Sequence, residues 1–197
     1  MLATINEWAF AAEVLLQGTP SGIDNTVSTY GQALSFRNQP KATMCLMPEL
    51  PHLNLLITNT NVDRESKKLI QGVRALYDRW PSIMQPIFEG ISAISQHFRE
   101  AVENKVENIH IDEMIVLNQQ LLQCLQVSHP AIERVCHIAT QHGVSTKLTG
   151  AGGGGCTVSL LPETFSDKQT EALINDLSEA GFVCYLTPIG GNGVQLH

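Results

Sequence analysis

The spacing of apolar residues predicts two helices at the start of the chain. Between residues 6 and 17 the apolar side chains share one helical face: Trp8, Ala11, Ala12, Leu15 and Leu16. Gly18-Thr19-Pro20 ends this pattern. The turn Pro20-Ser21-Gly22 then leads into a second, short helix that begins near Asp24. Two acids, Glu13 and Asp24, therefore flank one turn.

Helical periodicity returns between residues 69 and 141. His129-Pro130 starts the last of these helices and Gly143 ends it, because proline suits a first helical turn and glycine a C-terminus. We expect the apolar stripes to pack in a core, since a core requires such faces. The stripes are Leu69, Val73, Leu76 and Trp80; Ile87, Ile91, Ile94, Phe98 and Val102; Leu117, Leu121, Leu122 and Leu125; and Ile132, Val135, Cys136 and Ala139.

Short apolar and β-branched runs predict strands on both sides of this helical region. They cover residues 33–37, 43–47 and 53–58, and then 145–149, 156–161, 182–187 and 194–196, with a helix at 166–180. Strands and helices come in blocks and do not alternate regularly. This order predicts an α+β fold, in which an antiparallel sheet carries helices on one face.

Composition excludes several classes of protein. Of the 197 residues 43% are hydrophobic and 16% charged, which is typical of a globular chain. A formal net charge of −7 argues against nucleic acid as a partner, since binding a phosphate backbone requires clustered Lys and Arg. No apolar stretch is long enough for a membrane span. The five cysteines lack the CxxC spacing of metal sites, and we expect reduced thiols in a cytoplasmic protein.

The most distinctive segment is Lys147-Leu-Thr-Gly-Ala-Gly-Gly-Gly-Gly-Cys156. A dinucleotide fingerprint requires a helix directly after the glycines, whereas Cys156 begins a predicted strand. A P-loop requires a lysine after its last glycine, and a protein-kinase glycine loop requires more chain than the 42 residues that follow Gly155. A flexible linker is the plain alternative. Because a predicted strand lies on each side, we favour a loop whose backbone amides hold an anion, with Lys147 adding positive potential.

The two acids leave two interpretations open. Asp24 can complement the start of the helix that follows it, and Glu13 can be a surface residue. Alternatively, a carboxylate held by a Pro/Gly turn can orient and deprotonate a substrate hydroxyl, while a second carboxylate holds Mg²⁺ at nucleotide phosphates. Spacing alone does not decide between them.

Three segments together resemble a known family. They are Gly18-Thr-Pro-Ser-Gly-Ile-Asp-Asn25 with Val27-Ser-Thr-Tyr-Gly31, Leu55-Leu-Ile-Thr-Asn-Thr60, and the glycine-rich segment 147–156. In this order they are similar to the GHMP kinase superfamily, and the Pro-Ser-Gly-Ile-Asp-Asn stretch is similar to its mevalonate kinase branch. The resemblance implies a cytoplasmic enzyme that uses ATP and Mg²⁺ to phosphorylate the 5-hydroxyl of mevalonate, in isoprenoid and sterol biosynthesis.

The resemblance also implies roles for individual residues. An aspartate at the position of Asp24 is the catalytic base in that family, and a glutamate at the position of Glu13 ligates Mg²⁺. The region that binds substrate and phosphate corresponds to Lys147, Thr149, Gly150, Ala151, Gly152 and Gly153. Arg64 and Ser66 fall in a segment that faces the active site in the family. The implied fold is the ferredoxin-like GHMP kinase C-terminal domain, and a homodimer is compatible with it.

The chain departs from the family pattern in one respect. The family's lysine partner of the catalytic aspartate and its Pro-x-x-x-Gly-Leu-Gly-Ser-Ser-Ala nucleotide loop do not occur here. We therefore expect residues 1–36 to be a helical remnant of an N-terminal domain that exposes apolar side chains, and residues 37–197 to be the C-terminal domain. Such a chain should have little or no activity alone. Another GHMP small-molecule kinase, or a non-catalytic interaction module, remains the alternative.

Overall fold

The computed structural model describes most of the chain, and its residues form two compact units. The described residues are 1–17, 20–37, 43–47, 50–51, 53–63, 65–106 and 109–195. Unit 1 comprises Met1–His52, Arg99–Val106 and Pro188–His197, and unit 2 comprises Leu53–Phe98 and Glu107–Thr187. Each unit is described by itself below. The boundary predicted between residues 36 and 37 stays a prediction.

Unit 2 is built on a four-stranded sheet with the order β4-β5-β3-β6. The strands are β3 (Asn54–Asn59), β4 (Ser145–Leu148), β5 (Cys156–Leu161) and β6 (Val183–Pro188), and β5 pairs antiparallel with both β3 and β4. The α+β class with an antiparallel sheet is thus confirmed. Strand β5 begins directly after the glycines, as the β-branched run predicted, and the glycine segment therefore connects two neighbouring antiparallel strands.

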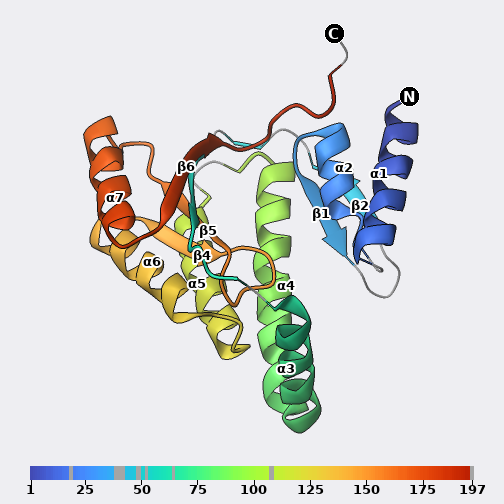
Figure 1. The fold of residues 1–197 in the computed structure, drawn as a ribbon, viewed down its shortest axis with the longest axis horizontal. Helices are drawn as coiled ribbons and strands as arrows, with labels where there is room; N and C mark the ends of the chain where they lie inside the picture. Colours follow the sequence, from blue (N-terminus) through green and yellow to red (C-terminus); the bar gives the residue numbers. More distant parts are fainter. Residues whose placement is uncertain are drawn as a thin grey trace. The chain divides into compact units, whose positions relative to one another are not determined.

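One face of the sheet is covered by helices (Figure 1). The helices are α5 (Ile111–Cys124), α6 (Pro130–Gln141) and α7 (Asp167–Glu179). Alternate strand residues are buried beneath them, among them Leu56, and the intervening residues are only half-buried. Fully buried Val135 and Leu177 from the helices join Leu56 in one apolar cluster. Burial of this cluster is the main force that holds α6 and α7 to the sheet.

A second apolar cluster joins α5 and α6 to the long helical region. That region forms α3 (Ser66–Arg79) and α4 (Pro81–Glu103). The second cluster contains Met84, Ile132 and Leu148, and members of the predicted stripes pack against it: Val73, Leu76, Ile87, Ile91, Leu122 and Cys136. Two stripe residues depart from the prediction, because Trp80 and Leu117 are 53% and 52% exposed. Periodicity identifies a helix face but does not identify the neighbour that covers it.

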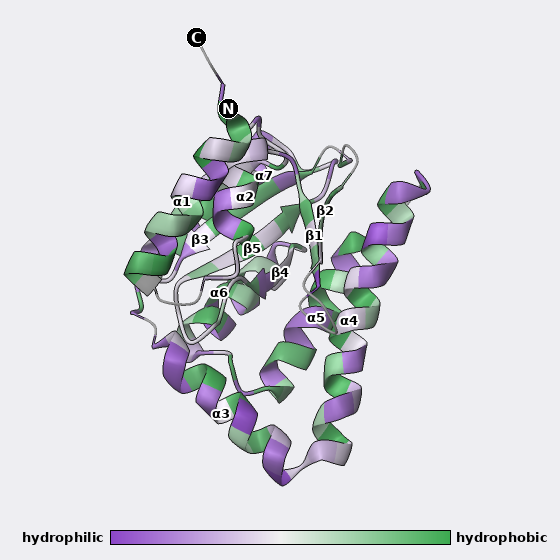
Figure 2. Ribbon diagram, turned by 90° about the vertical axis from the view of Figure 1, so that its right-hand side faces the viewer, coloured by the Kyte–Doolittle hydropathy of each residue, from purple (hydrophilic) through white to green (hydrophobic). Residues whose placement is uncertain are grey.

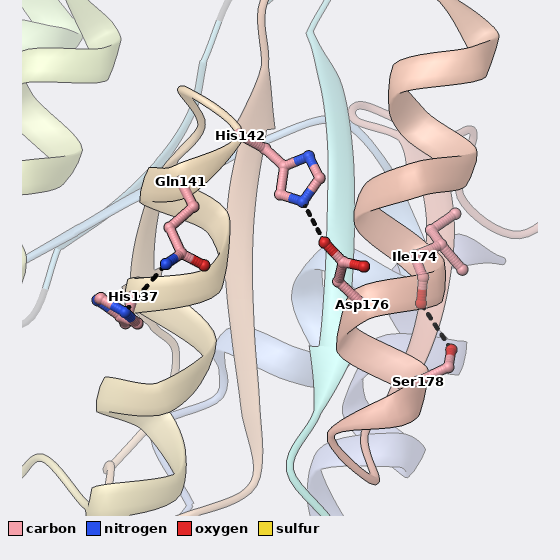
Figure 3. Close-up of polar contacts among 6 residues, drawn as sticks. All are labelled: His137, Gln141, His142, Ile174, Asp176 and Ser178. Carbon is pink, nitrogen blue, oxygen red and sulfur yellow. Dashed lines mark hydrogen bonds and ion pairs between the residues drawn. The ribbon is translucent and has the colours of Figure 1, made fainter.

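A polar contact also connects the end of α6 to α7 (Figure 3). The ring Nε2 of His142, directly after α6, lies 2.7 Å from a carboxylate oxygen of Asp176 on α7. At its other end α6 begins with His129, whose Nδ1 accepts the Ala131 amide, and α7 begins with a capping box at Ser166. Both helices therefore begin at a side-chain cap, and the start of α6 agrees with the His129-Pro130 signal in the sequence.

Unit 1 contains α1 (Leu2–Gln17), α2 (Ile23–Tyr30) and an antiparallel pair, β1 (Leu34–Arg37) and β2 (Thr43–Leu46). Residues 191–194 return to the end of α2. There Gly31 pairs with Asn192, and the Val194 amide donates to the Thr29 carbonyl across 3.0 Å. The strand predicted at 194–196 is therefore wrong for residues 194 and 195, and Leu196 lies outside the described residues.

The first helix exposes much of its apolar face. Trp8, Leu15 and Leu16 are 77%, 88% and 86% exposed, in agreement with the prediction that this helix exposes apolar side chains. Figure 2 shows hydrophobic residues recurring along α1. Despite this apolar character, none of the described helices combines the length and hydropathy that crossing a bilayer requires.

Candidate functional site

The glycine segment is a tightly folded loop, because five of its residues adopt a backbone that favours glycine. The φ angles of Gly150, Gly152, Gly153, Gly154 and Gly155 are +73°, +81°, +71°, +134° and +70°. L-residues with a Cβ rarely adopt this region of φ. At its base, the Thr149 amide donates to the Cys156 carbonyl across 3.1 Å and closes the loop between β4 and β5. A flexible linker would show no such closure.

One side of the loop rests on the segment between α5 and α6. The Gly153 amide donates to the Val127 carbonyl across 2.8 Å. A Cβ placed on Gly152 would lie only 2.0 Å from the same carbonyl oxygen. Glycine is required here because the loop backbone approaches another backbone directly.

The other side of the loop rests on the segment after β3. The Gly155 amide donates to the Val62 carbonyl across 3.1 Å, and the Gly155 carbonyl accepts both the amide and the hydroxyl of Thr60. A Cβ on Gly153 would lie 2.6 Å from a methyl carbon of Leu69, so the first turns of α3 also lie beside the loop. These contacts hold the loop on three sides.

The contacts divide the loop amides into two groups. The amides of Gly153 and Gly155 are used within the protein, whereas no acceptor among the described residues receives the amides of Gly150, Ala151, Gly152 or Gly154. Gly150 is exposed and Ala151 half-buried. The sign of φ alternates from Gly150 through Ala151 to Gly152. Successive amides in such a turn can point into one concavity, which is how backbone nests bind anions.

Lys147 lies on β4, two residues before the loop. Its ammonium group donates to the Leu148 carbonyl across 2.8 Å. Burial lowers the pKa of Lys147, since a desolvated ammonium loses hydration without regaining it from a counter-charge. Among the described residues no carboxylate forms an ion pair with it. A half-buried cation without a carboxylate partner is suited to interact with an anionic ligand.

Two further predicted residues lie near this region in sequence. Ser66 is the first residue of α3, whose Leu69 contacts the loop, so the fold brings the start of α3 and the glycine segment together. Arg64 lies outside the described residues. A role for either residue in binding stays a prediction.

The two acids belong to unit 1. Glu13 is half-buried on α1, and Asp24 is exposed in the first turn of α2. The residue at the N-cap of α2 is Gly22, so Asp24 does not cap this helix. The helices α1 and α2 pack together, and the Asn25 side chain donates to the Asn6 side-chain oxygen across 2.7 Å. This bond fixes how α2, and with it Asp24, meets α1.

The acids are compatible with magnesium on chemical grounds. Among the described residues no three potential metal ligands cluster together. Mg²⁺ does not require such a cluster, because it keeps several waters and is usually held by one or two carboxylates plus substrate phosphates. Glu13 and Asp24 offer hard oxygen donors from two packed helices, which is the donor type that Mg²⁺ prefers.

Sequence reasoning missed the residues that support the loop. Val127 and Val62 contribute through backbone carbonyls, which leave no mark on residue type. Gln119 is 5% exposed and accepts the Leu148 amide at the end of β4, but its position on an amphipathic helix indicated nothing unusual. A cluster of glycines between strands does signal close backbone approach, although it does not identify the partner.

Comparison with known proteins defines the class. Residues 106–183 match the family model described as GHMP kinases C terminal. The chain therefore carries a C-terminal domain of the GHMP kinase family. Relatives similar in sequence include mevalonate kinases: the chain is 39% identical to that of Mus musculus and 40% identical to that of Arabidopsis thaliana, each over 202 residues. These alignments cover 100% and 99% of this chain but 50% and 52% of the relatives.

Solved structures show the same fold. The match to a crystal structure of L. major mevalonate kinase in complex with R-mevalonate covers 98% of this chain and 60% of the L. major chain. Its TM-score is 0.83 at 24% identity. The Methanococcus jannaschii mevalonate kinase matches with a TM-score of 0.73 at 20% identity. The chain spans about half the length of the curated relatives it matches.

Proposed function

We propose that this chain provides the half of a mevalonate kinase that carries the catalytic aspartate and the glycine loop, in an enzyme that transfers the terminal phosphoryl group of ATP to the 5-hydroxyl of mevalonate in the cytoplasm. The observation that carries the proposal is identity of 36% to 40% to mevalonate kinases over the full length of this chain. Such similarity over every element supports a common reaction more strongly than the fold does, since one fold hosts many functions.

The glycine loop supports the phosphate-binding part of this proposal. Gly150 and Ala151 present amides that no described residue uses, and no carboxylate among the described residues pairs with Lys147. Phosphoryl transfer develops charge on the phosphate oxygens, and fixed donors that already point at those oxygens stabilise it without reorganisation. Gly152, Gly153 and Thr149 would maintain the loop in that shape.

The two acids would supply the remaining chemistry. Asp24 is exposed and would accept the proton of the attacking hydroxyl, and Glu13 would help to hold Mg²⁺. Magnesium, when bound, neutralises charge on the nucleotide phosphates.

Activity would depend on the part of the relatives that this chain does not match. Because the chain spans about half of them, we expect the isolated chain to bind Mg-ATP poorly and to phosphorylate mevalonate slowly or not at all. Joining the chain to the unmatched half of the Mus musculus relative should restore mevalonate phosphorylation, measured as ADP release. A chimera that folds and binds Mg-ATP but never phosphorylates mevalonate would contradict the proposal.

Two other functions are distinguishable. A lactococcal galactokinase structure matches 93% of this chain with a TM-score of 0.58, so the fold also suits kinases of other small alcohols. A panel of mevalonate, phosphomevalonate, homoserine and galactose given to the chimera would identify such a specificity. The exposed apolar face of α1 favours the second alternative, a non-catalytic module that associates with an intact kinase or with itself. Association with intact kinase, without binding of either substrate in calorimetry, would support it.

A further inference from the structure

We propose that Gln119, Ser128 and Glu133 are positioning residues, which hold the glycine loop in its anion-binding shape although none of them belongs to the loop. The inference rests on the proposed function in one respect, since it takes the loop to be the anion site. The contacts that carry it lie entirely within unit 2.

Gln119 on α5 is the centre of this network. Its side-chain oxygen accepts the Leu148 amide across 2.8 Å. Its side-chain nitrogen donates to the Ser128 hydroxyl oxygen across 3.3 Å and to the Glu133 carboxylate across 3.2 Å. The side chain is 5% exposed and uses both ends of its amide. A buried amide with every contact made is strongly oriented, because any rotation leaves a polar group unpaired.

Glu133 on α6 completes the network. Its carboxylate accepts the Ser128 hydroxyl and, through the other oxygen, the Gln123 side chain across 2.5 Å. Gln123 is exposed, so this last bond competes with water. The bonds to Gln119 and Ser128 are partly buried and tie α5, α6 and the segment between them into one arrangement.

The network acts on the loop at two points. Leu148 is the last residue of β4, and the loop begins with the next residue. Ser128 directly follows Val127, whose carbonyl accepts the Gly153 amide and lies against Gly152. Fixing Leu148 and Val127 therefore fixes the start of the loop and the surface beneath its middle. Along the chain, Gly150 and Ala151 lie between Leu148 and the Gly152-Gly153 stretch that rests on Val127, so the network supports the loop on both sides of their amides.

Glu133 contributes more than packing to this network, because its negative charge strengthens the hydrogen bonds that it accepts. A carboxylate at position 133 accepts from two donors at one oxygen, which a neutral hydroxyl or amide does less strongly. A second carboxylate at position 119 would repel the Glu133 carboxylate. The hydrogen bonds that the Gln119 nitrogen donates to Ser128 and Glu133 would then be lost. The charge of Glu133 therefore predicts that a carboxylate at position 119 disrupts the network and that a neutral residue at position 133 then restores it. Simple packing predicts no such restoration.

Hydrogen exchange of individual amides tests the inference on the chain as it is. In Gln119→Met and in the milder Ser128→Ala, the Leu148 and Gly153 amides should exchange about tenfold or more faster than in the unaltered chain. Gln120→Met is the matched control, since Gln120 is the exposed neighbour on the same helix. Acceleration of all sheet amides by one common factor would show loss of stability alone and would overturn the inference.

A charge exchange provides the second test. Gln119→Glu alone should accelerate exchange at Leu148 and Gly153, because two carboxylates would face each other. The double variant Gln119→Glu with Glu133→Gln restores one carboxylate and one amide and should recover most of the protection. Absence of rescue in a folded double variant would contradict the proposed pairing.

Pyrophosphate titration links the network to the proposed function. In the unaltered chain, added pyrophosphate should shift the amide resonances of Gly150 and Ala151, and Ser128→Ala should weaken this binding about tenfold. If the unaltered chain binds no pyrophosphate, the anion site fails, and exchange at Gly153 still decides the positioning role. If the unaltered chain binds and Ser128→Ala binds equally well, the positioning role is wrong.

Discussion

Gly152 faces the carbonyl oxygen of Val127 so closely that a Cβ on the glycine would lie 2.0 Å from that oxygen. The φ of Gly152 is also +81°. Two independent constraints, backbone conformation and backbone approach, therefore require glycine at one position. The glycine loop is a packed element of the fold with little freedom to move, and this rigidity is what an anion site made of backbone amides requires.

The first prediction concerns that close approach. Gly152→Ala should lower the free energy of unfolding by about 2 to 4 kcal/mol, because strain at positive φ adds to a clash that backbone cannot easily relieve. Gly143→Ala is the matched control, since φ there is +72° but no atom lies within 4 Å of the added Cβ. The control should lose only about 1 kcal/mol. Urea denaturation measures the free energy of unfolding of both variants. Equal losses in Gly152→Ala and Gly143→Ala would show that the close approach to Val127 adds nothing.

The second prediction concerns the role of Asp24. In a chimera that phosphorylates mevalonate, Asp24→Asn should lower kcat by about a hundredfold to ten-thousandfold, the usual contribution of a general base. Asp112→Asn, an exposed acid in the first turn of α5, is the control and should keep the original rate. A chimera whose rate survives Asp24→Asn would remove this carboxylate from the reaction.

The third prediction concerns the pH dependence of Lys147. Burial lowers its pKa, so between the lowered pKa and 10.5 the unfolded chain binds more protons than the folded chain. Stability should therefore rise with pH across this window because of Lys147. In Lys147→Met this contribution disappears. The difference in the free energy of unfolding between the variant and the unaltered chain should therefore shrink as the pH approaches 10.5. Urea denaturation from pH 7 upward measures it, and a difference independent of pH would contradict the burial of the charge.

The fourth prediction concerns thiol reactivity. Burial, with a smaller contribution from the charge of Glu133, raises the pKa of Cys136 to about 12. Against its ordinary value of 9.0, this leaves about a thousandfold less thiolate near pH 8. Ellman's reagent should therefore react rapidly with exposed Cys124 and very slowly with Cys136 in the folded chain. Cys136→Ser should leave the rapid phase unchanged, whereas Cys124→Ser should reduce it.

The fifth prediction concerns the exposed face of α1. Leu15→Gln combined with Leu16→Gln should reduce binding of a hydrophobic dye and self-association, because both side chains are more than four-fifths exposed. Ile70→Gln provides the control, since Ile70 is an exposed apolar residue on a different helix. Light scattering and dye fluorescence measure the two effects. If Ile70→Gln reduces dye binding and self-association equally, the exposed face of α1 is not the surface responsible for them.

Much of the fold was predictable because local signals agreed with packing. The boundaries of α6 follow from His129-Pro130 and Gly143, and the apolar stripe of that helix is buried as predicted. The exposure of Trp80 was not predictable, because an apolar stripe does not identify the neighbour that would cover it. The predicted strand was wrong at residues 194 and 195, because the Val194 amide bonds to the end of α2 and neither residue joins a sheet.

The site was predictable only in part. Five glycines between two predicted strands indicated close backbone approach, and the structure shows it at Gly152 and Gly154. Which loop amides remain available was not predictable, since Val127 and Val62 take two of them through backbone carbonyls. Gln119 escaped notice because a polar residue on an amphipathic helix usually faces water.

The pairing of residues 191–194 with the end of α2 has a consequence for how this protein is made. The helix that carries Asp24 is synthesised before Asn192, so the Gly31–Asn192 bridge forms only after that downstream segment has been made. Until then α2 lacks this support, and Leu15 and Leu16 of the neighbouring α1 stay exposed even in the folded chain. Chaperones that bind apolar helices during synthesis would therefore find α1 available to them.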